Sequence, residues 1–252
     1  MIGIIGGSGV YEISNIADSI EEKTVDTEYG SVEVSILDIN SKKVAFIPRH
    51  QKGHKTPPHM INYKANIQAL KNCGVNQIIA TNAVGSMNLD MPPGTFVLVD
   101  DFLDFTVLRE KTFFDDEVHH MDLSQPYCSR LRNVILSCAD DNESIIDHGT
   151  YVCTDGPRFE TASEIKMFKL LECDVVGMTG LPEVVLAREK EMCYQAICIV
   201  TNFATSISED LLTFEEVKEI TSKKNKALLN LLHSIILNLD DDFDCFCLNA
   251  LE

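Results

Sequence analysis

Residues 1–9 read MIGIIGGSG, a short apolar run that passes directly into glycines and a hydroxyl. An apolar run of this length, bounded by turn residues, predicts a buried β-strand over residues 1–5. Glycines at the end of such a strand let backbone N–H groups approach an anion closely, and Ser8 adds a donor. Because the spacing matches neither a dinucleotide fingerprint nor a Walker loop, a phosphate loop and a plain tight turn both stay open here.

The same kind of strand recurs along the chain and alternates with amphipathic, helix-like stretches. Further strands are expected at residues 32–39, 44–48, 77–83, 95–99, 149–154, 174–178 and 196–202, and helices at 59–72, 129–141, 162–173, 182–193 and 214–239. Thr161 with Glu164 forms a capping-box pattern at one helix start. The alternation predicts an α/β fold: a single domain with a central mixed, largely parallel β-sheet flanked by helices. Residues 104–121 are expected to form a long loop.

The composition is that of a globular protein. Of the 252 residues, 45% are hydrophobic and 24% charged, which excludes a collagen or a disordered tail and suffices for one large domain. Asp and Glu number 39 against 21 Lys and Arg, so the formal net charge is −18. A nucleic-acid binder needs a basic face, and we expect no such partner. No apolar run reaches the ~18 residues of a membrane span, so no membrane partner is expected.

Nine cysteines are scattered through the chain. The odd count, with no basic N-terminal region that would indicate a secretion signal, predicts reduced thiols and a cytoplasmic location. Neither paired CxxC nor HxxxH spacing occurs, so no metal site is expected. The last two cysteines, Cys245 and Cys247, flank Phe246 in an acidic tail, residues 241–252, which follows the expected domain at residues 1–240.

Five further polar or glycine-containing segments each close an apolar strand. They are residues 49–54, 81–86, 154–161, 176–183 and 201–204. Taken singly, each segment also fits a purely structural role, such as a solvent-exposed basic turn, a turn that requires glycine, or a carboxylate at the start of a helix. Since ligands of open α/β sheets bind at the carboxyl ends of strands, we expect one composite cleft that holds an anion and a flat heterocycle. No nucleophile elbow is present, so the chemistry is expected to depend on positioning.

Several long motifs, in order, carry a specific resemblance to a known family. They include IIGGSG from residue 4, RHQKGHKTPPHMIN over 49–62, ATNAVGS from residue 80, PGTFVLVDDFLDFT over 93–106, GPRFET from residue 156 and DVVGMTGLPEVVLAREKEMCY from residue 174. Over residues 1 to about 239 the sequence resembles the trimeric purine nucleoside phosphorylase family, and within it the methylthioadenosine phosphorylase branch. The resemblance implies a purine/uridine phosphorylase-like fold and a homotrimer, with a dimer of trimers as the alternative. It also implies reversible phosphorolysis in purine salvage, with phosphate as co-substrate and no cofactor.

The resemblance also assigns roles to individual residues. The implied phosphate-binding residues are Ser8, Arg49, His50, Asn82, Ala83 and Thr179. The residues implied to surround the ribose and the base are Phe159, Glu160, Met178, Asn202, Phe203 and Ala204. Catalysis is expected to rest on Asn202, Arg49 and His50, with no metal, and His120 to reach from a neighbouring subunit toward the 5′ end of the sugar.

Two departures from the adenosine-specific branch bear on the substrate. That branch carries aspartate at the positions of Asn202 and Ala204 and serine at that of Glu160, whereas the Asn and Glu of this sequence resemble the 6-oxopurine enzymes. An asparagine can donate to a 6-carbonyl, which an aspartate repels. Conversely, 6-oxopurine enzymes for ordinary nucleosides place histidine at the position of Phe214, and an apolar ring there favours a 5′-methylthio group. The implied substrate is S-methyl-5′-thioinosine, giving hypoxanthine and S-methyl-5-thioribose 1-phosphate.

Other readings stay open. The nearest is a general 6-oxopurine nucleoside phosphorylase for inosine and guanosine, followed by a methylthioadenosine phosphorylase, a hydrolytic nucleosidase and a non-catalytic purine-binding protein. For Cys245 and Cys247 there are two. One is a frayed tail with idle thiols. The other is a resemblance to the C-terminal pair of some heat-stable relatives, which forms a strained disulfide and affects stability rather than turnover.

Overall fold

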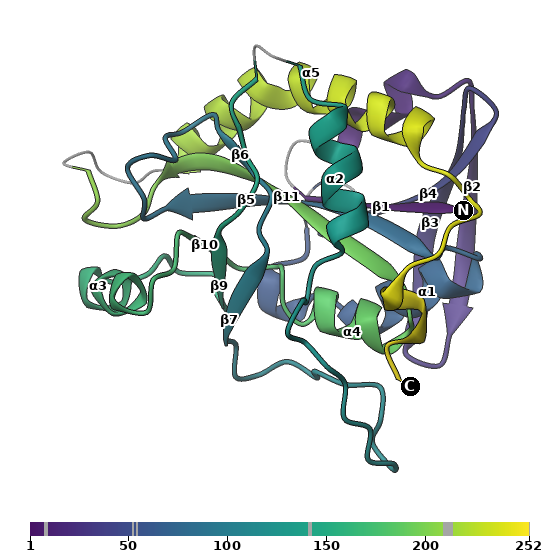
Figure 1. Cartoon of the computed structure of the whole chain (residues 1–252), viewed down its shortest axis with the longest axis horizontal. Coiled ribbons are helices and arrows are strands. Elements are labelled where there is room, and N and C mark those ends of the chain that lie inside the picture. The colour runs from purple at the N-terminus through teal and green to yellow at the C-terminus, as the bar shows by residue number, and fades with distance from the viewer. Residues whose placement is uncertain (8–9, 52, 54, 141–142, 209–213, 252) are drawn as a thin grey trace.

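A mixed eleven-stranded sheet forms the centre of the molecule in the computed structural model (Figure 1). The structure describes residues 1–7, 10–51, 53, 55–140, 143–208 and 214–251, with the backbone alone at Tyr11 and residues 214–218. The strands are β1 (Ile2–Gly6), β2 (Ser19–Thr27), β3 (Gly30–Ile39), β4 (Lys42–Pro48), β5 (Gln77–Ser86), β6 (Phe96–Val97), β7 (Asp101–Phe105), β8 (Ile145–Ile146), β9 (Thr150–Thr154), β10 (Val175–Gly177) and β11 (Cys193–Phe203).

The strand order brings the chain's polar strand ends to one edge. The main path runs β2-β3-β4-β1-β5-β10-β9-β7, and β11 pairs with both β5 and β6. The first strand, β1, lies between β4 and β5 and is parallel to both, with Ile2 opposite Val44 on one side and Gln77 on the other. The strands β5 and β11 are parallel to each other. The carboxyl ends of β4, β1, β5 and β11 therefore lie side by side. The expected α/β fold with a mixed central sheet is confirmed.

Helices cover both faces of the sheet (Figure 1). They are α1 (Tyr63–Asn72), α2 (Ser129–Ser137), α3 (Ala162–Leu170), α4 (Glu183–Glu189) and α5 (Phe214–Asn238), with short 3-10 turns at Tyr11–Ile16, Pro58–Met60 and Phe246–Asn249. Side chains of β1 alternate between two core clusters: Ile2 and Ile4 pack with α2 and α5, and Ile5 packs with α1 and α4. This alternation is the two-residue period of a strand buried on both faces.

Three strands were not expected from the sequence: β2, β7 and the two-residue strand β8. The strand β2, SIEEKTVDT, buries only Val25 and forms an antiparallel hairpin with β3. A strand with so few apolar residues lacks the pattern that identifies a buried strand. The strand β7 extends into the segment expected to be a loop, so that loop begins at Thr106 rather than at Asp104.

Helix boundaries also differ from the expected ones. The capping box at Thr161 and Glu164 is confirmed at the start of α3. The helix α4 ends at Glu189, four residues before the expected end, and β11 begins at Cys193. The reason is local: Glu191 has φ of +53°, which a helix does not accommodate. The reversal there sends the chain directly into β11.

The segment that follows α5, including the acidic tail, packs back onto β5 and α2. Gln77 Nε2 donates to the carbonyl of Asp240 at 2.9 Å, and the Arg130 guanidinium lies 3.7 Å from the centre of the Phe243 ring. Cys245 and Cys247 are buried, unlinked thiols within one core cluster, in place of a frayed end or a bond between the two. No helix of the described ranges has both the length and the apolarity to cross a membrane.

Candidate active site

A cavity of about 370 Å³ lies where β1, β4, β5, β10 and β11 end. Its wall contains these residues that the sequence predicted: Arg49, His50, Ala83, Phe159, Glu160, Met178, Thr179, Asn202 and Ala204. These residues are up to 155 positions apart in the chain, from Arg49 to Ala204. The expectation of one composite cleft at the strand ends therefore agrees with the positions of these side chains.

The remaining predicted residues do not line the cavity or are not among the residues that the structure describes. Asn82 is buried behind the wall, where its Nδ2 donates to Thr179 Oγ1 at 2.9 Å. Phe203 lies beside the cavity rather than in its wall, at the end of β11 opposite Ser86. His120 is exposed in the long loop. Ser8 and the side chain of Phe214 fall outside the described residues, and their predicted roles stay predictions.

A buried ion pair joins Arg49, a residue of the cavity wall, to Glu183. Arg49 Nε and Nη2 donate to the two carboxylate oxygens of Glu183 at 2.7 and 2.6 Å, and both side chains are fully buried. The Tyr194 hydroxyl donates to the same carboxylate at 2.7 Å. Burial lowers the pKa of Arg49, but the charge and hydrogen bonds of Glu183 raise it by more, so the guanidinium stays charged.

The pairing leaves Arg49 with donors to spare. A guanidinium carries five N–H groups, and the bonds to Glu183 together with one from Nη1 to the Thr81 carbonyl at 2.7 Å use three. The pair as a whole is neutral. An anion in the cavity is therefore attracted by oriented N–H groups near it and not by a net positive charge on this pair.

The backbone of Gly7 lies close to Arg49 and to the Thr81 carbonyl. Its N–H donates to Thr81 Oγ1 at 3.0 Å. A Cβ atom at Gly7 would lie 2.5 Å from the Thr81 carbonyl oxygen and 3.1 Å from Arg49 Nη1. Because both distances are shorter than normal contacts, the position requires glycine. The glycine-rich segment predicted from the sequence therefore serves close packing against β5, whatever else it binds.

A β-bulge in β11 presents two consecutive polar residues to the cavity. Val200 pairs with Val84 and Asn202 with Gly85, so Thr201 is the extra residue. In a regular strand neighbours point to opposite faces, but here both Thr201 and Asn202 line the wall. The Thr201 hydroxyl donates to Asn202 Oδ1 at 2.8 Å, and Asn202 Nδ2 donates one hydrogen to the Phe203 carbonyl at 2.8 Å, which leaves its second hydrogen as a donor.

Glu160 and Phe159 form the opposite side of the cavity. Glu160 is 8% exposed and accepts a 2.7 Å hydrogen bond from the Thr154 hydroxyl. Burial raises the pKa of Glu160, and the Thr154 hydrogen bond opposes that change only in part. Phe159 is 42% exposed. The two residues offer a flat ring an aromatic surface beside a hydrogen-bond acceptor.

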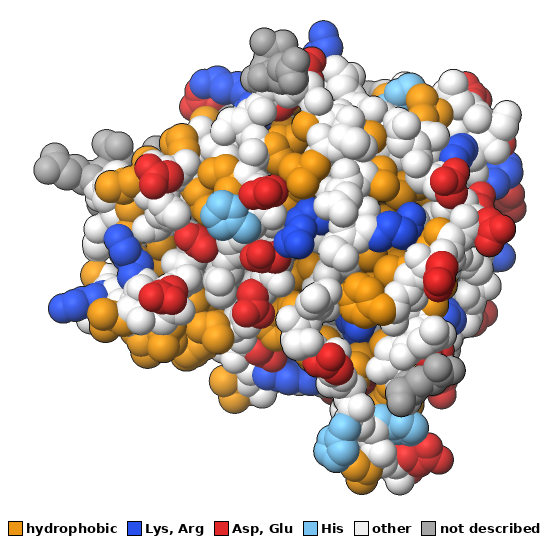
Figure 2. Space-filling view, in the orientation of Figure 1, with side chains coloured by type: hydrophobic (Ala, Val, Ile, Leu, Met, Phe, Trp, Pro, Cys, Tyr) orange, Lys and Arg blue, Asp and Glu red, His pale blue; other side chains and the backbone are white. Residues whose placement is uncertain are grey.

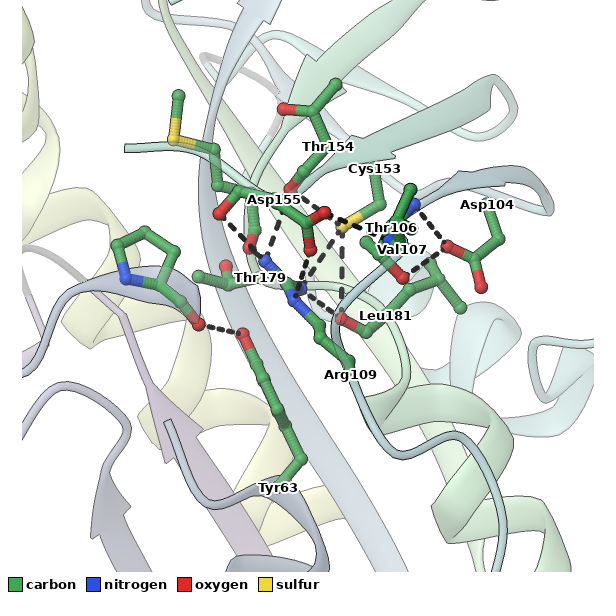
Figure 3. A network of polar contacts seen from close by, with 12 residues as sticks. Tyr63, Asp104, Thr106, Val107, Arg109, Cys153, Thr154, Asp155, Thr179 and Leu181 are labelled. Carbon is green, nitrogen blue, oxygen red and sulfur yellow. Dashed lines mark hydrogen bonds and ion pairs between the residues drawn. The ribbon is translucent and has the colours of Figure 1, made fainter. Parts of the chain in front are cut away.

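A buried arginine that sequence reasoning missed ties the long loop to the cavity wall (Figure 3). Arg109 donates to the Met178 carbonyl at 2.7 Å, to those of Thr154 and Asp155 at 3.2 Å, and to that of Leu181. These carbonyls belong to the segments that follow β9 and β10. Arg109 therefore fixes the backbone beside Met178 and Thr179. Its position in a loop gave no sign of this, because the partners are main-chain atoms distant in sequence.

Other wall residues also escaped prediction. They are Gly7, Lys55, Thr56, Pro57, Pro58, Val84, Gly85, Pro157, Val176, Gly177 and Thr201. Most lie within or next to the predicted segments and contribute backbone or apolar surface. His50 Nδ1 lies 2.8 Å from the Thr56 carbonyl, which joins the two sides of one turn. On the face drawn in Figure 2, Lys and Arg side chains are interspersed with Asp and Glu, as expected for an acidic protein whose cations act locally.

Comparison with protein families and curated proteins gives matches over nearly the whole chain. The family model described as "Phosphorylase superfamily" matches residues 1–237. A "Probable S-methyl-5'-thioinosine phosphorylase" of Methanothermobacter thermautotrophicus is 50% identical over 253 aligned positions, covering 100% of this chain and 89% of the relative. A "6-oxopurine nucleoside phosphorylase" of Pyrococcus furiosus is 47% identical and covers 100% of this chain and 97% of the relative.

Solved structures with the same fold are also similar in sequence. A methylthioadenosine phosphorylase from Schistosoma mansoni in complex with adenine superimposes with a TM-score of 0.88 at 33% identity, covering 94% of this chain and 90% of that one. A methylthioadenosine phosphorylase from an antarctic soil metagenomic library gives a TM-score of 0.91 at 30% identity, covering 99% and 90%.

The buried ion pair of Arg49 and Glu183 predicts strong coupling between its two residues. Glu183→Leu alone leaves the Arg49 charge buried without its partner and should lower the free energy of unfolding by about 3–5 kcal/mol. The double variant Arg49→Met with Glu183→Leu leaves neither charge and should lose clearly less than the sum of the two single changes. Urea denaturation of the four proteins measures this. Additive losses would contradict a buried, mutually dependent pair.

Proposed function

Because the chain belongs to the Phosphorylase superfamily, we propose that it catalyses the reversible phosphorolysis of a purine nucleoside, with S-methyl-5′-thioinosine as the preferred substrate. The observation that carries the proposal is that one cavity wall combines two unlike groups of side chains. Arg49, His50 and Thr179 form the first group, and Phe159, Glu160 and Asn202 form the second. An anion suits the first group of side chains and a flat heterocycle suits the second.

The proposed mechanism stabilises charge as it develops. Cleavage of the glycosidic bond builds positive charge on the ribose and negative charge on the departing purine. Phosphate held near Arg49 and His50 stabilises the ribosyl cation and attacks its C1′ atom. The Asn202 amide stabilises the purine as it gains charge, with a proton arriving at N7. A hydrogen bond that strengthens in the transition state lowers the barrier rather than the Michaelis constant alone. No metal or organic cofactor enters these steps.

Base selectivity is proposed to follow from Asn202 and Glu160. The Thr201 hydroxyl donates to Oδ1 of Asn202, and Nδ2 donates one hydrogen to the Phe203 carbonyl, so the second Nδ2 hydrogen is the one available to donate to a 6-carbonyl. An ionised Glu160 accepts from the N1–H group of a 6-oxopurine, whereas N1 of adenine carries no hydrogen. A 6-oxopurine therefore matches both side chains better than a 6-aminopurine does.

Residue type and the relatives support further proposals on the 5′ group of the sugar, the assembly of subunits and the cellular role. Phe214 begins α5, and its apolar ring is proposed to favour a 5′-methylthio group over a 5′-hydroxyl. We propose further that His120 approaches the sugar of a neighbouring subunit in a homotrimer or a dimer of trimers, and that the protein acts in cytoplasmic purine salvage. The second candidate is a general 6-oxopurine nucleoside phosphorylase, because relatives with both substrate names match at 50% and 47% identity.

The test is release of base from inosine, guanosine, methylthioadenosine and methylthioinosine, each with and without phosphate. Strict dependence on phosphate with the highest kcat/KM for methylthioinosine is expected. Release without phosphate would establish a hydrolase instead, and no release from any of the four would favour a binding protein. A preference for inosine and guanosine would select the second candidate.

Asn202→Asp should shift the preference from 6-oxo toward 6-amino purines. The carboxylate cannot donate to the carbonyl, and a mismatched buried hydrogen bond costs about 1–3 kcal/mol, or roughly tenfold to a hundredfold in specificity. The measurement is the ratio of kcat/KM for methylthioinosine over methylthioadenosine. Thr201→Val serves as the matched control, since it removes the hydroxyl that holds Oδ1 but keeps the amide. An unchanged ratio in Asn202→Asp would remove Asn202 from base recognition.

Phe214→His should improve inosine relative to methylthioinosine, because an imidazole gives the 5′-hydroxyl a hydrogen-bond partner that a phenyl ring lacks. The kcat/KM ratio of the two substrates is the readout, and thermal stability is the check on folding. If the ratio stays at its original value, Phe214 does not face the 5′ group.

A further inference from the structure

Four cysteines that are far apart in sequence meet in the interior. The Sγ atoms of Cys128, Cys193, Cys245 and Cys247 all lie within 4.8 Å of one another, and all four residues are buried. The Sγ atoms of Cys128 and Cys245 are 3.6 Å apart. In a tetrahedral zinc site with Zn–S bonds of about 2.3 Å, the sulfur atoms are separated by about 3.8 Å. The cluster therefore already has nearly the dimensions of such a site.

We propose that Cys128, Cys193, Cys245 and Cys247 bind one structural zinc ion as four thiolates. Four thiolates in a closed tetrahedral arrangement are a donor set typical of zinc. On binding, the Zn²⁺ ion replaces the four thiol protons, which pass to solvent, and the site acquires a net charge of about −2. No open coordination position remains, so the ion has no catalytic role.

The backbone of the tail directs both of its cysteines inward. Cys245 is extended, with φ of −159° and ψ of 137°, and caps the 3-10 turn at Phe246–Asn249. With this geometry, Cys245 is 7% and Cys247 0% exposed, whereas Phe246 between them is 45% exposed. A CxC pair can thus supply two ligands to one site, although its spacing is shorter than the usual pattern that sequence reading looks for.

The other two ligands lie on rigid elements. Cys128 is the residue at the N-terminal cap of α2, and Cys193 is the first residue of β11. The backbone N–H of Cys128 donates to the Tyr194 carbonyl at 2.9 Å, which holds the two segments together. The ion would therefore join the chain's tail to a helix start and to a central strand.

The charges around the cluster suit a negatively charged site. The Arg188 guanidinium lies 4.8 Å from the centre of the Phe246 ring. Arg188 is 2% exposed, and its Nε and Nη1 have no hydrogen-bond partner among the described residues. A buried cation without such partners is costly, and a neighbouring tetrathiolate would compensate for it. The tail passes from the end of α5 to finish beside α4, which carries Arg188 (Figure 1).

The proposed zinc site lies far from the cavity, so we expect it to stabilise the fold and to take no part in catalysis. Cys193 begins β11 and Asn202 follows nine positions later, a separation of about 30 Å along a strand. Loss of the ion should therefore reduce stability without changing turnover at moderate temperature.

The test uses the full chain, expressed with zinc and purified without added chelator. About one zinc ion per chain by elemental analysis, with four cysteines protected from alkylation until a strong chelator is added, is expected. Chelation should lower the melting temperature by about 10 °C or more. Co²⁺ in place of zinc should give the thiolate-to-metal absorption of a tetrahedral site. Each of these readouts is independent of catalysis.

The variant pair isolates the cluster. Cys245→Ser with Cys247→Ser should abolish zinc binding and reproduce the melting temperature of the chelated protein, while kcat at moderate temperature is unchanged. Cys73→Ser, a half-buried cysteine at the end of α1 and outside the cluster, should keep the zinc. A protein without zinc whose four cysteines are free thiols, or are disulfides by mass spectrometry without reductant, would overturn the proposal. So would iron in place of zinc. If the double variant does not fold, the metal content of the unaltered protein still decides.

Discussion

The buried pair of Arg49 and Glu183 is the constraint on which the cavity depends. It joins the end of β4 to the start of α4, while Tyr194 from β11 and the Thr81 carbonyl from β5 bond to the same two side chains. Removing two charges from water is unfavourable, and a buried pair is weak evidence for stability. Its consequence here is positional, because a guanidinium held by a carboxylate fork keeps its remaining N–H groups in one place. In a chain of net charge −18, that placement would give the proposed phosphate a local site.

The part of the cavity wall around Thr201 and Asn202 is built from irregular backbone. The bulge at Thr201 lets two neighbouring residues of one strand face the same cavity, as bulges near functional sites commonly do. Arg109 fixes the segments after β9 and β10 by bonding to their carbonyls rather than to side chains. The polar groups that would recognise a base therefore sit on backbone that is held from behind. Such support is what a site that acts by positioning requires.

The sequence could predict most of the sheet but only part of what supports the cavity. Runs of Val, Ile and Thr identify strands that are buried on both faces, and polar residues at their ends identify the wall residues, such as Arg49 and Asn202. The strand β2 escaped because Val25 is its one buried side chain and pairing with β3 stabilises it. Glu183 and Arg109 escaped because a buried ion pair and carbonyl contacts arise from tertiary structure. The cysteine cluster escaped for the same reason, since its four members come from three separate regions of the chain.

The most direct test of the anion site is a crystal structure of the protein with phosphate and hypoxanthine bound. We expect a phosphate oxygen within hydrogen-bonding distance of the Arg49 guanidinium, with the Arg49–Glu183 pair intact, and the purine ring between Phe159 and Asn202. Phosphate bound away from Arg49, or Glu183 displaced from Arg49 when phosphate binds, would contradict the role of the ion pair in positioning the anion.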